Sequence, residues 1–281
     1  MVELLRLVEK LSVFTFLVCS MLAMGLSLTL QAIFAPLRNF RLVLLALALN
    51  FILAPGYAWL LTIVIPLQRG HAIGILLLGA AAGAPFLPTL VETARGDLAA
   101  AVALTVLLTI GTVLFMPLAL PLLIPGLQTD TWSIARPLVT FIMLPMVIGM
   151  IIKPRGRRLA ARAAPVLAKI GNACLLLLFV LLIALNIRAL IGVVEIGAIA
   201  VALFYIIGLF IPAWLLAGPK LEVRSVIALG TAARNFGAAL VPTATSFHDP
   251  AVTMMLIVSA IIGLAILFIA AAWLRRRVDP S

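Results

Sequence analysis

Nine stretches of mostly apolar residues follow one another along the chain, separated by short polar segments. Each is close to the roughly 20 residues that an α-helix needs to cross a bilayer. No polar segment between them is long enough to fold as a separate soluble domain. The pattern predicts an all-α polytopic membrane protein with nine transmembrane helices. Residues 1–281 are expected to form a single transmembrane domain of the transporter type. The stretches cover residues 11–34, 42–65, 72–91, 98–124, 137–152, 165–187, 193–217, 225–244 and 251–274.

The first stretch, residues 11–34, is too long for the apolar core of a signal peptide and has no convincing small-residue cleavage site. Further membrane segments follow it directly. We interpret it as a retained transmembrane helix.

Composition agrees with a membrane protein. Of the 281 residues, 65% are hydrophobic and only 10% are charged, which is too apolar for a soluble domain of this size. The net charge is +11, but the basic residues cluster beside apolar stretches, which indicates membrane lipid rather than nucleic acid as the partner. Cys19 and Cys174 lie within apolar stretches, without the spacing of a metal or redox site. We expect no cofactor, metal centre or disulfide.

The basic residues also predict an orientation. With nine spans the two termini lie on opposite sides of the membrane. Most of the 20 Lys and Arg residues fall on the side of the C-terminus, which the positive-inside rule places in the cytoplasm of a plasma or bacterial inner membrane. One more, Arg234, falls inside a span. The opposite side, with the N-terminus, has only Arg6, Lys10, Arg69, Arg136 and Arg188.

Two halves of the chain resemble each other. The segments 55–61 and 212–216 share a proline, a tryptophan and a pair of leucines, and each lies at or near the end of an apolar stretch. Each is followed by an interrupted stretch and then by one that begins after an acid, Asp97 or Asp249. The interrupted stretches are the third and the eighth, so the two halves enter the membrane in opposite directions. Such inverted repeats are typical of secondary transporters.

The third and eighth stretches cannot remain regular helices. The third contains Pro85 and Pro88, and proline removes a backbone donor and clashes with the preceding turn. The eighth contains Gly230 and Gly237 on either side of Arg234. Backbone groups that are freed at membrane depth must be buried in protein or line a wet cavity. We expect two broken helices that meet near the middle of the membrane and form a site there, although prolines can also merely kink a helix.

Arg234 is the most informative residue of the chain. A charge in the middle of a transmembrane helix costs roughly 2.5 to 3.5 kcal/mol, so Arg234 faces a cavity or a partner. Two interpretations stay open at this point. Its planar guanidinium suits a carboxylate or sulfate of a substrate, and it also suits backbone carbonyls of the other broken helix.

The chain resembles the bile acid:sodium symporter family over nearly its whole length. The features that carry the resemblance are the segment 24–28, Asn50 five residues before Pro55, the segment 95–97 followed by 101–105, and the segment 234–240. The resemblance implies a core domain with two crossing broken helices and a panel domain that moves against it. We expect the panel in part of residues 11–65 and in 137–187, and the core in 72–124 and 193–274. The chain then lacks the extra first helix of ten-span relatives.

The chain departs from the family at the positions that bind sodium. Where sodium-coupled members have a Ser-Asn pair, a serine, a glutamate and two glutamines, this chain has Leu87, Pro88, Ala101, Gly230, Asn50 and Arg234; only the family's threonine is kept, as Thr105. Most oxygen ligands are therefore gone, and a fixed guanidinium repels a nearby cation. We expect that sodium is not bound in the usual manner, and that Arg234 supplies its positive charge permanently.

The resulting hypothesis is a transporter of small organic anions, such as bile acids, sulfated steroids or small carboxylates like pantoate. The expected binding residues are Asn50, Thr89, Thr105, Thr231, Arg234 and Asn235, and the expected hinges are Pro85, Pro88, Gly230 and Gly237. The alternatives are a conventional sodium symporter with rebuilt ligands and a membrane ligand sensor. An enzyme is disfavoured because no catalytic constellation lies at membrane depth. Oligomeric state and direction of flux stay open.

The remaining ionisable residues suggest no separate chemistry. Glu92 could carry a coupling proton, but its place near the cytoplasmic end favours a solvated side chain. Asp97 and Asp249 have the position of helix N-caps. We assign no function to His71 and His248, which lie opposite the cytoplasmic side without metal-ligand neighbours.

Overall fold

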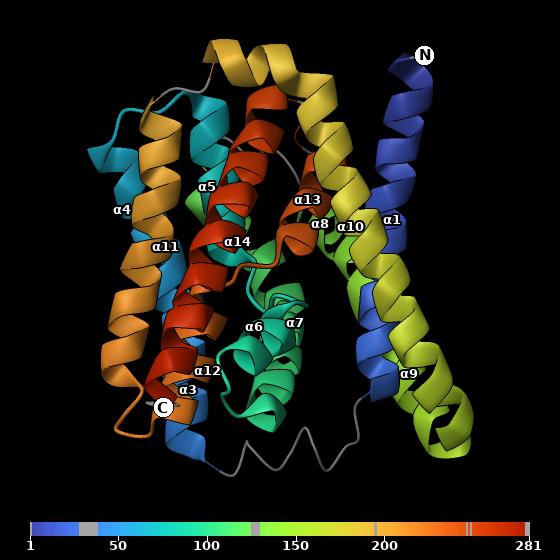
Figure 1. Ribbon diagram of the computed structural model, residues 1–281. Helices are drawn as coiled ribbons and strands as arrows, with labels where there is room; N and C mark the ends of the chain where they lie inside the picture. The colour runs from blue at the N-terminus through green and yellow to red at the C-terminus, as the bar shows by residue number, and fades with distance from the viewer. Residues whose placement is uncertain are drawn as a thin grey trace.

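The computed structural model describes residues 2–27, 39–124, 130–193, 196–245, 247 and 249–278, and every element in these ranges is helical (Figure 1). His248 and residues 28–34 of the first predicted span lie outside the described residues. The first half contains α1 (Val2–Ser27), α3 (Phe40–Ala48), the π-helix η1 (Leu49–Leu53), α4 (Ala54–Val64), α5 (Arg69–Ala80), α6 (Leu87–Thr93) and α7 (Leu98–Leu123). The second half contains α8 (Thr131–Leu138), the π-helix η2 (Val139–Met143), α9 (Leu144–Arg155), α10 (Arg157–Val193), α11 (Ile196–Leu216), α12 (Leu221–Ala232), α13 (Phe236–Thr245) and α14 (Pro250–Val278).

Seven segments among the described residues are long and apolar enough to cross a membrane, so the chain is a polytopic membrane protein. Each overlaps one of the predicted spans. The other two predicted spans, 72–91 and 225–244, are each divided between two shorter helices, α5 with α6 and α12 with α13. The seven segments are Glu3–Ser27, Phe40–Val64, Leu98–Leu123, Thr131–Arg155, Arg157–Leu178, Gly197–Leu216 and Pro250–Arg277.

Several helices extend beyond the predicted apolar stretches. α1 begins at Val2 instead of Leu11, and α10 begins at Arg157 instead of Pro165. Arginine, lysine, leucine and alanine are all good helix formers, and long basic side chains reach water from the edge of a membrane. The apolar pattern therefore marks the membrane-buried part of these helices and not their ends.

One group of helices lies on the right in Figure 1, where α1 packs against α9 and α10. α1 and α9 approach closely at Gly25 and Gly149, because a Cβ on either glycine would overlap main-chain atoms of the other helix. Gly171 of α10 likewise lies against Ser20 of α1. Small residues at such crossings let transmembrane helices pack backbone to backbone.

A second group lies on the left in Figure 1. There α4 packs against α5 and α11, and α14 packs against α5 and α11. The Tyr57 hydroxyl of α4 donates a hydrogen bond of 3.1 Å to the Phe204 carbonyl of α11, and its ring fills the space beside Gly208. Part of residues 11–65 was expected in the panel. In the structure, α1 lies with α9 and α10, whereas the helices from 40 to 64 lie with α5 and α11.

The two groups meet in a small apolar cluster. Val13 of α1, Leu178 of α10, Leu240 of α13, and Met254 and Ile257 of α14 pack together there. Val13 precedes the part of α1 that faces the cavity described below, so the cluster lies on the side of the cavity that is nearer to the N-terminus.

Two acids begin helices, as the sequence predicts. Asp97 accepts a 2.9 Å hydrogen bond from the Ala100 amide at the start of α7, and Asp249 accepts one of 2.9 Å from the Ala251 amide at the start of α14. α6 ends at Thr93, and Arg95, two residues later, has a positive φ of 54°. The Arg95 and Gly96 amides donate to the Glu92 and Val91 carbonyls, which is a Schellman ending with arginine in the place that glycine usually takes. The hydrogen bonds of Asp97 and Asp249 confirm the predicted N-caps.

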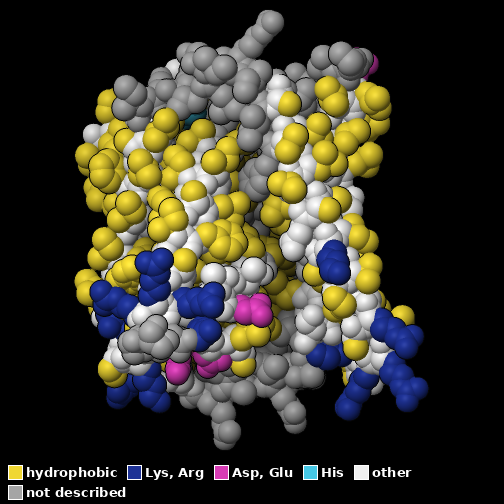
Figure 2. Space-filling model, viewed as in Figure 1, with side chains coloured by type: hydrophobic (Ala, Val, Ile, Leu, Met, Phe, Trp, Pro, Cys, Tyr) yellow, Lys and Arg dark blue, Asp and Glu magenta, His cyan; other side chains and the backbone are white. Residues whose placement is uncertain are grey.

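The surface reflects the membrane. Apolar side chains cover the middle of the face shown in Figure 2, and lysine and arginine side chains gather at its lower end. Large apolar residues such as Ile52, Leu122 and Ile269 are more than two-thirds exposed, which suits contact with lipid chains.

Candidate functional site

The first break lies between α5 and α6. α5 ends at Ala80, and Ala81 after it is extended. Gly83 has a φ of +77° and closely approaches the Thr109 backbone, which suits glycine alone. Pro85 lies in the break, and Pro88 lies in the first turn of α6, where a missing amide hydrogen does no harm. The prediction that this stretch is interrupted is confirmed.

Two threonines of α7 satisfy the backbone of this break. The Thr112 hydroxyl accepts a 2.8 Å hydrogen bond from the Ala82 amide and donates one of 3.0 Å to the Ala82 carbonyl. The Thr109 hydroxyl donates to the Gly83 carbonyl at 3.1 Å. The backbone groups of Ala82 and Gly83 are therefore satisfied by side chains of a neighbouring helix, as membrane depth requires.

The second break lies between α12 and α13, at residues 233–235. Asn235 joins it directly to the first break: its backbone amide donates to the Ala81 carbonyl at 3.0 Å, and its side-chain amide donates to the Gly83 carbonyl at 3.0 Å. Its side-chain oxygen accepts from the Ala238 amide at 3.0 Å and so caps α13. The two broken segments thus contact each other at their breaks.

The predicted hinge glycines flank the second break and are not part of it. Gly230 lies in the last part of α12, where an added Cβ would meet Leu104 and Leu87. Gly237 lies at the start of α13, where a Cβ would overlap the Leu17 side chain of α1. Both positions need a small residue because of close packing rather than because of backbone conformation.

Arg234 lies at the centre of the crossing, with only 2% of its surface exposed. Its Nε donates to the Leu78 carbonyl at 3.0 Å and its Nη2 to the Gly79 carbonyl at 2.9 Å. Its Nη1 donates to the Thr231 carbonyl at 3.1 Å and to the Asn50 side-chain oxygen at 2.8 Å. None of its partners in the described part of the chain is a carboxylate.

Three of the four acceptors of Arg234 share one property. The Leu78 and Gly79 carbonyls belong to the last turn of α5, and the Thr231 carbonyl belongs to the last turn of α12. Carbonyls at helix C-termini lack intrahelical partners and carry the negative end of the helix dipole. The guanidinium therefore occupies a cage of oxygen atoms that suits a cation and has no formal negative charge.

Asn50 completes this cage from a π-helix. It lies in η1, directly before the segment that begins with Ala54 and Pro55. Pro55, just after η1, lacks the amide hydrogen that a regular helix would use. π-Helical turns often occur at functional positions. The fully buried Asn50 side chain donates to the Ala46 carbonyl at 3.0 Å and to the Thr231 hydroxyl at 3.4 Å, which directs its oxygen at Arg234.

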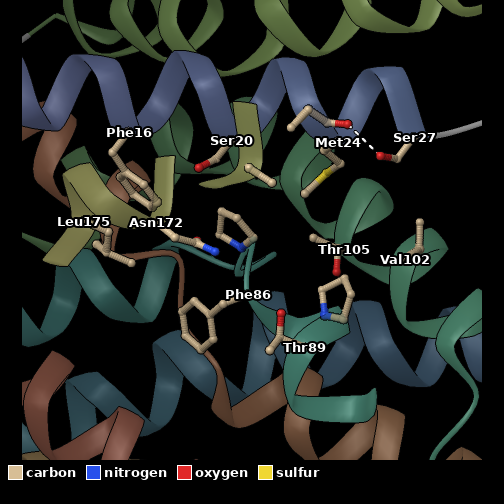
Figure 3. A pocket seen from close by; sticks show the side chains of 14 residues that line it. Phe16, Ser20, Met24, Ser27, Phe86, Thr89, Val102, Thr105, Asn172 and Leu175 are labelled. Carbon is tan, nitrogen blue, oxygen red and sulfur yellow. Dashed lines mark hydrogen bonds between the residues drawn. The ribbon is translucent and has the colours of Figure 1, made fainter. Parts of the chain in front are cut away.

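A cavity of about 230 Å³ lies beside the crossing, between α1, α10, the first break and α7. Figure 3 shows Ser20 and Met24 of α1 on one side and Phe86 and Thr89 on the other, with Asn172 of α10 between them. Its polar lining consists of hydroxyl and amide groups, and none of the described lining residues is charged. The described lining residues are Phe16, Ser20, Ala23, Met24, Ser27, Pro85, Phe86, Pro88, Thr89, Val102, Thr105, Ala168, Asn172 and Leu175.

The six predicted binding residues thus fall into two sets. Asn50, Thr231, Arg234 and Asn235 meet at the buried crossing. Thr89 and Thr105 line the cavity instead.

Sequence reasoning missed four polar residues. Thr109 and Thr112 continue from Thr105 at spacings of four and three, a polar stripe on an apolar helix that could have been recognised. Ser20 and Asn172 are single polar residues in apolar stretches, and only the packing of α1 and α10 brings them to the cavity.

Buried apolar side chains stand at positions where the resemblance implies sodium ligands in the family. Leu87 is fully buried and lies against Gly230, and Ala101 is fully buried as well. Thr105 is also fully buried, but its hydroxyl donates to the Ala101 carbonyl at 2.8 Å. Apolar side chains therefore occupy space where the resemblance leads one to expect oxygen ligands.

A comparison with family models matches the chain to the Sodium Bile acid symporter family over residues 14–193. The matched region extends from α1 to the end of α10 and includes Asn50, the first break and the cavity lining on α1 and α10. No curated protein matches the chain.

Proposed function

Because the chain belongs to the sodium bile acid symporter family, whose members are membrane transporters and not enzymes, we propose that it carries small organic anions by alternating access around the crossing of its two broken helices. The observation that carries the proposal is the cage of oxygen atoms around Arg234. This cage would hold a cation in a coupled transporter, and here the cation is part of the protein.

The proposed architecture has nine spans, seven continuous and two broken. In it α1 and α8 to α10 form a panel, and the remaining helices form a core that contains both broken segments. Two facts support this division: the glycine contacts that join α1 to α9 and α10, and the hydrogen bonds of Asn235 that join the two breaks. The two halves are inverted repeats of each other.

Arg234 holds the crossing together and replaces sodium. Its burial and its four hydrogen bonds to protein oxygens support this role over direct pairing with a substrate. Two unit charges 4 Å apart repel each other by about 4 kcal/mol at the effective dielectric constant near a protein surface, so a sodium ion beside the guanidinium is disfavoured. Transport therefore does not depend on sodium in the manner usual for the family.

The substrate binds in the cavity between α1, α10 and the first break. An anion is favoured there because, in the described part of the chain, the positive charge of Arg234 is balanced by dipoles and not by a carboxylate. The hydroxyl and amide groups of Ser20, Thr89, Thr105 and Asn172 supply hydrogen bonds. The basic end of the molecule lies in the cytoplasm, and the apolar cluster of Val13, Leu178, Leu240, Met254 and Ile257 closes the cavity toward the outside.

Tracer flux into liposomes tests the proposal. The purified protein is reconstituted, and uptake of a panel of labelled organic anions is measured in sodium chloride and in choline chloride. We expect uptake of one class of anion at equal rates in the two salts. Uptake only in sodium would instead support a conventional symporter with rebuilt ligands, and binding without flux of any anion would support a ligand sensor.

A further inference from the structure

Two arginines from different helices lie on two adjoining tryptophans at one corner of the molecule. The corner is formed by the end of α11, the first turn of α12 and the end of α14, which lie close together at the lower left of Figure 1. We call the group of Trp214, Arg224, Trp273 and Arg277 the Arg–Trp corner. It is separate from the crossing and from the cavity.

The geometry of the corner fixes both guanidinium groups. The Arg224 guanidinium lies 4.1 Å above the Trp214 ring, and its Nε donates a 3.0 Å hydrogen bond to the Trp214 carbonyl. The Arg277 guanidinium lies 4.1 Å above the Trp273 ring. The two indoles meet edge to face at 6.0 Å between centroids, and Phe210 stacks on Trp214. Stacking on aromatic faces orders the arginines before any ligand binds.

Neither arginine has a carboxylate partner among the described residues. Glu222 is close in sequence to Arg224, but side chains two residues apart on a helix do not face each other. Other exposed basic residues lie nearby in the chain, namely Lys220, Arg275 and Arg276. The corner is therefore an ordered patch of positive charge that an anion can neutralise.

An apolar surface adjoins the charged groups. On α11, Ile207, Ile211 and Leu215 follow one another at helical spacing and are 42%, 50% and 67% exposed. On α14, Ile269 lies one turn before Trp273 on the same face and is 70% exposed. Tryptophan prefers the boundary between lipid chains and water. The corner thus combines a fixed pair of cations with an apolar wall on its membrane side.

We propose that the Arg–Trp corner binds an anionic phospholipid. The phosphodiester accepts hydrogen bonds from Arg224 and Arg277, for which guanidinium groups are well suited, and the acyl chains lie against α11 and α14. Because α12 carries one side of the crossing, a bound lipid also steadies the helix that ends beside Arg234. This inference does not depend on the identity of the transported solute.

Thermal unfolding of the purified protein with added lipid tests the inference. Phosphatidylglycerol is compared with phosphatidylcholine of the same acyl chains, and with inorganic phosphate as a free anion. We expect phosphatidylglycerol to raise Tm by several degrees, and phosphatidylcholine and phosphate to leave it nearly unchanged. Equal stabilisation by both lipids would overturn the proposal, and so would stabilisation by inorganic phosphate alone.

Variants assign the effect to the corner. Each basic residue near an anionic surface contributes about 1 kcal/mol, or roughly fivefold in affinity, so Arg224→Gln with Arg277→Gln should lower phosphatidylglycerol affinity about 25-fold in a lipid titration. The matched control, Arg157→Gln with Arg158→Gln at the start of α10, removes the same charge and should retain the affinity. An equal loss in the control would show that only net charge matters and would contradict a specific site. Arg224→Lys with Arg277→Lys keeps the charge, and a several-fold loss is still expected because lysine lacks the flat guanidinium.

Discussion

Arg234 and Asn50 are joined by a hydrogen bond of 2.8 Å, although 184 positions separate them in the chain. Asn50 supplies the single side-chain acceptor in the cage, since the other three are main-chain carbonyls. The net charge of the crossing can therefore be changed at position 50 without altering the backbone around it.

Replacement of Asn50 by aspartate separates structure from electrostatics. Asp is nearly the same size as Asn and can pair with the guanidinium, but it cannot donate to the Ala46 carbonyl as the Asn50 amide does, so we expect the protein to stay folded with a somewhat lower Tm than the wild type. The pair is neutral, and we expect anion uptake to fall by about tenfold or more, as for a lost coupling of 1.4 kcal/mol. Liposome flux and thermal unfolding measure the two effects. Undiminished uptake would show that the charge of Arg234 does not attract the substrate.

Replacement of Arg234 by glutamine should destabilise the protein by about 3 kcal/mol or more, because several buried carbonyls lose their donors. Sodium should not restore the loss, since Leu87, Pro88 and Ala101 offer no side-chain oxygen. Thermal unfolding in sodium and in choline is the measurement. Arg158→Gln, at an exposed position of α10, is the control and should change stability by no more than about 0.5 kcal/mol. Equal stability of Arg234→Gln and the wild type would contradict the role of the guanidinium in holding the crossing together.

The Thr112 hydroxyl should be needed to keep the first break in place. Thr112→Val keeps the shape of the side chain but leaves the Ala82 amide and carbonyl without their partner, which costs about 2 kcal/mol. Denaturation monitored by loss of tertiary signal measures the change. Thr140→Val, at an exposed position of η2, should cost much less. Equal effects of the two substitutions would mean that the α7 threonines do not support the break.

Access to the cavity should be one-sided. Asn172→Cys, in a background with Cys19→Ala and Cys174→Ala, places a single thiol on the exposed lining of α10. We expect a membrane-impermeant thiol reagent to label it in inside-out vesicles, and labelling to slow when a transported anion is added. Labelling of intact cells from the outside at the same rate would contradict both the proposed orientation and the closure by the apolar cluster.

The sequence predicts those parts of the site that depend on local chemistry. Pro85 lies in the first break and Pro88 begins the helix after it, Asp97 and Asp249 cap the helices that follow them, and a buried arginine such as Arg234 requires acceptors. The spans are predicted well for the same reason, since lipid imposes the same apolar pattern on every membrane helix.

Other parts of the site depend on which helices become neighbours, and the sequence does not reveal that. Ser20 and Asn172 look like isolated polar residues until α1 and α10 meet at the cavity. The helices from 40 to 64 were expected in part beside α1, but Tyr57 and Gly208 fit together and hold them against α11. The choice between substrate and backbone as the partner of Arg234 also needed the positions of Leu78 and Gly79, which are more than 150 residues away.

The Arg234 guanidinium at the crossing also determines which gradient can drive transport. A sodium ion leaves with the substrate and so draws on the sodium gradient, whereas a cation that belongs to the polypeptide cannot be released. An anion that crosses without a co-ion experiences the membrane voltage alone, which is worth about 2.3 kcal/mol per charge at 100 mV. With the cell interior negative, this voltage drives a monovalent anion outward, to a ratio of about fiftyfold at equilibrium. The replacement of one ligand by arginine would thus turn a fold associated with accumulation into one suited to export.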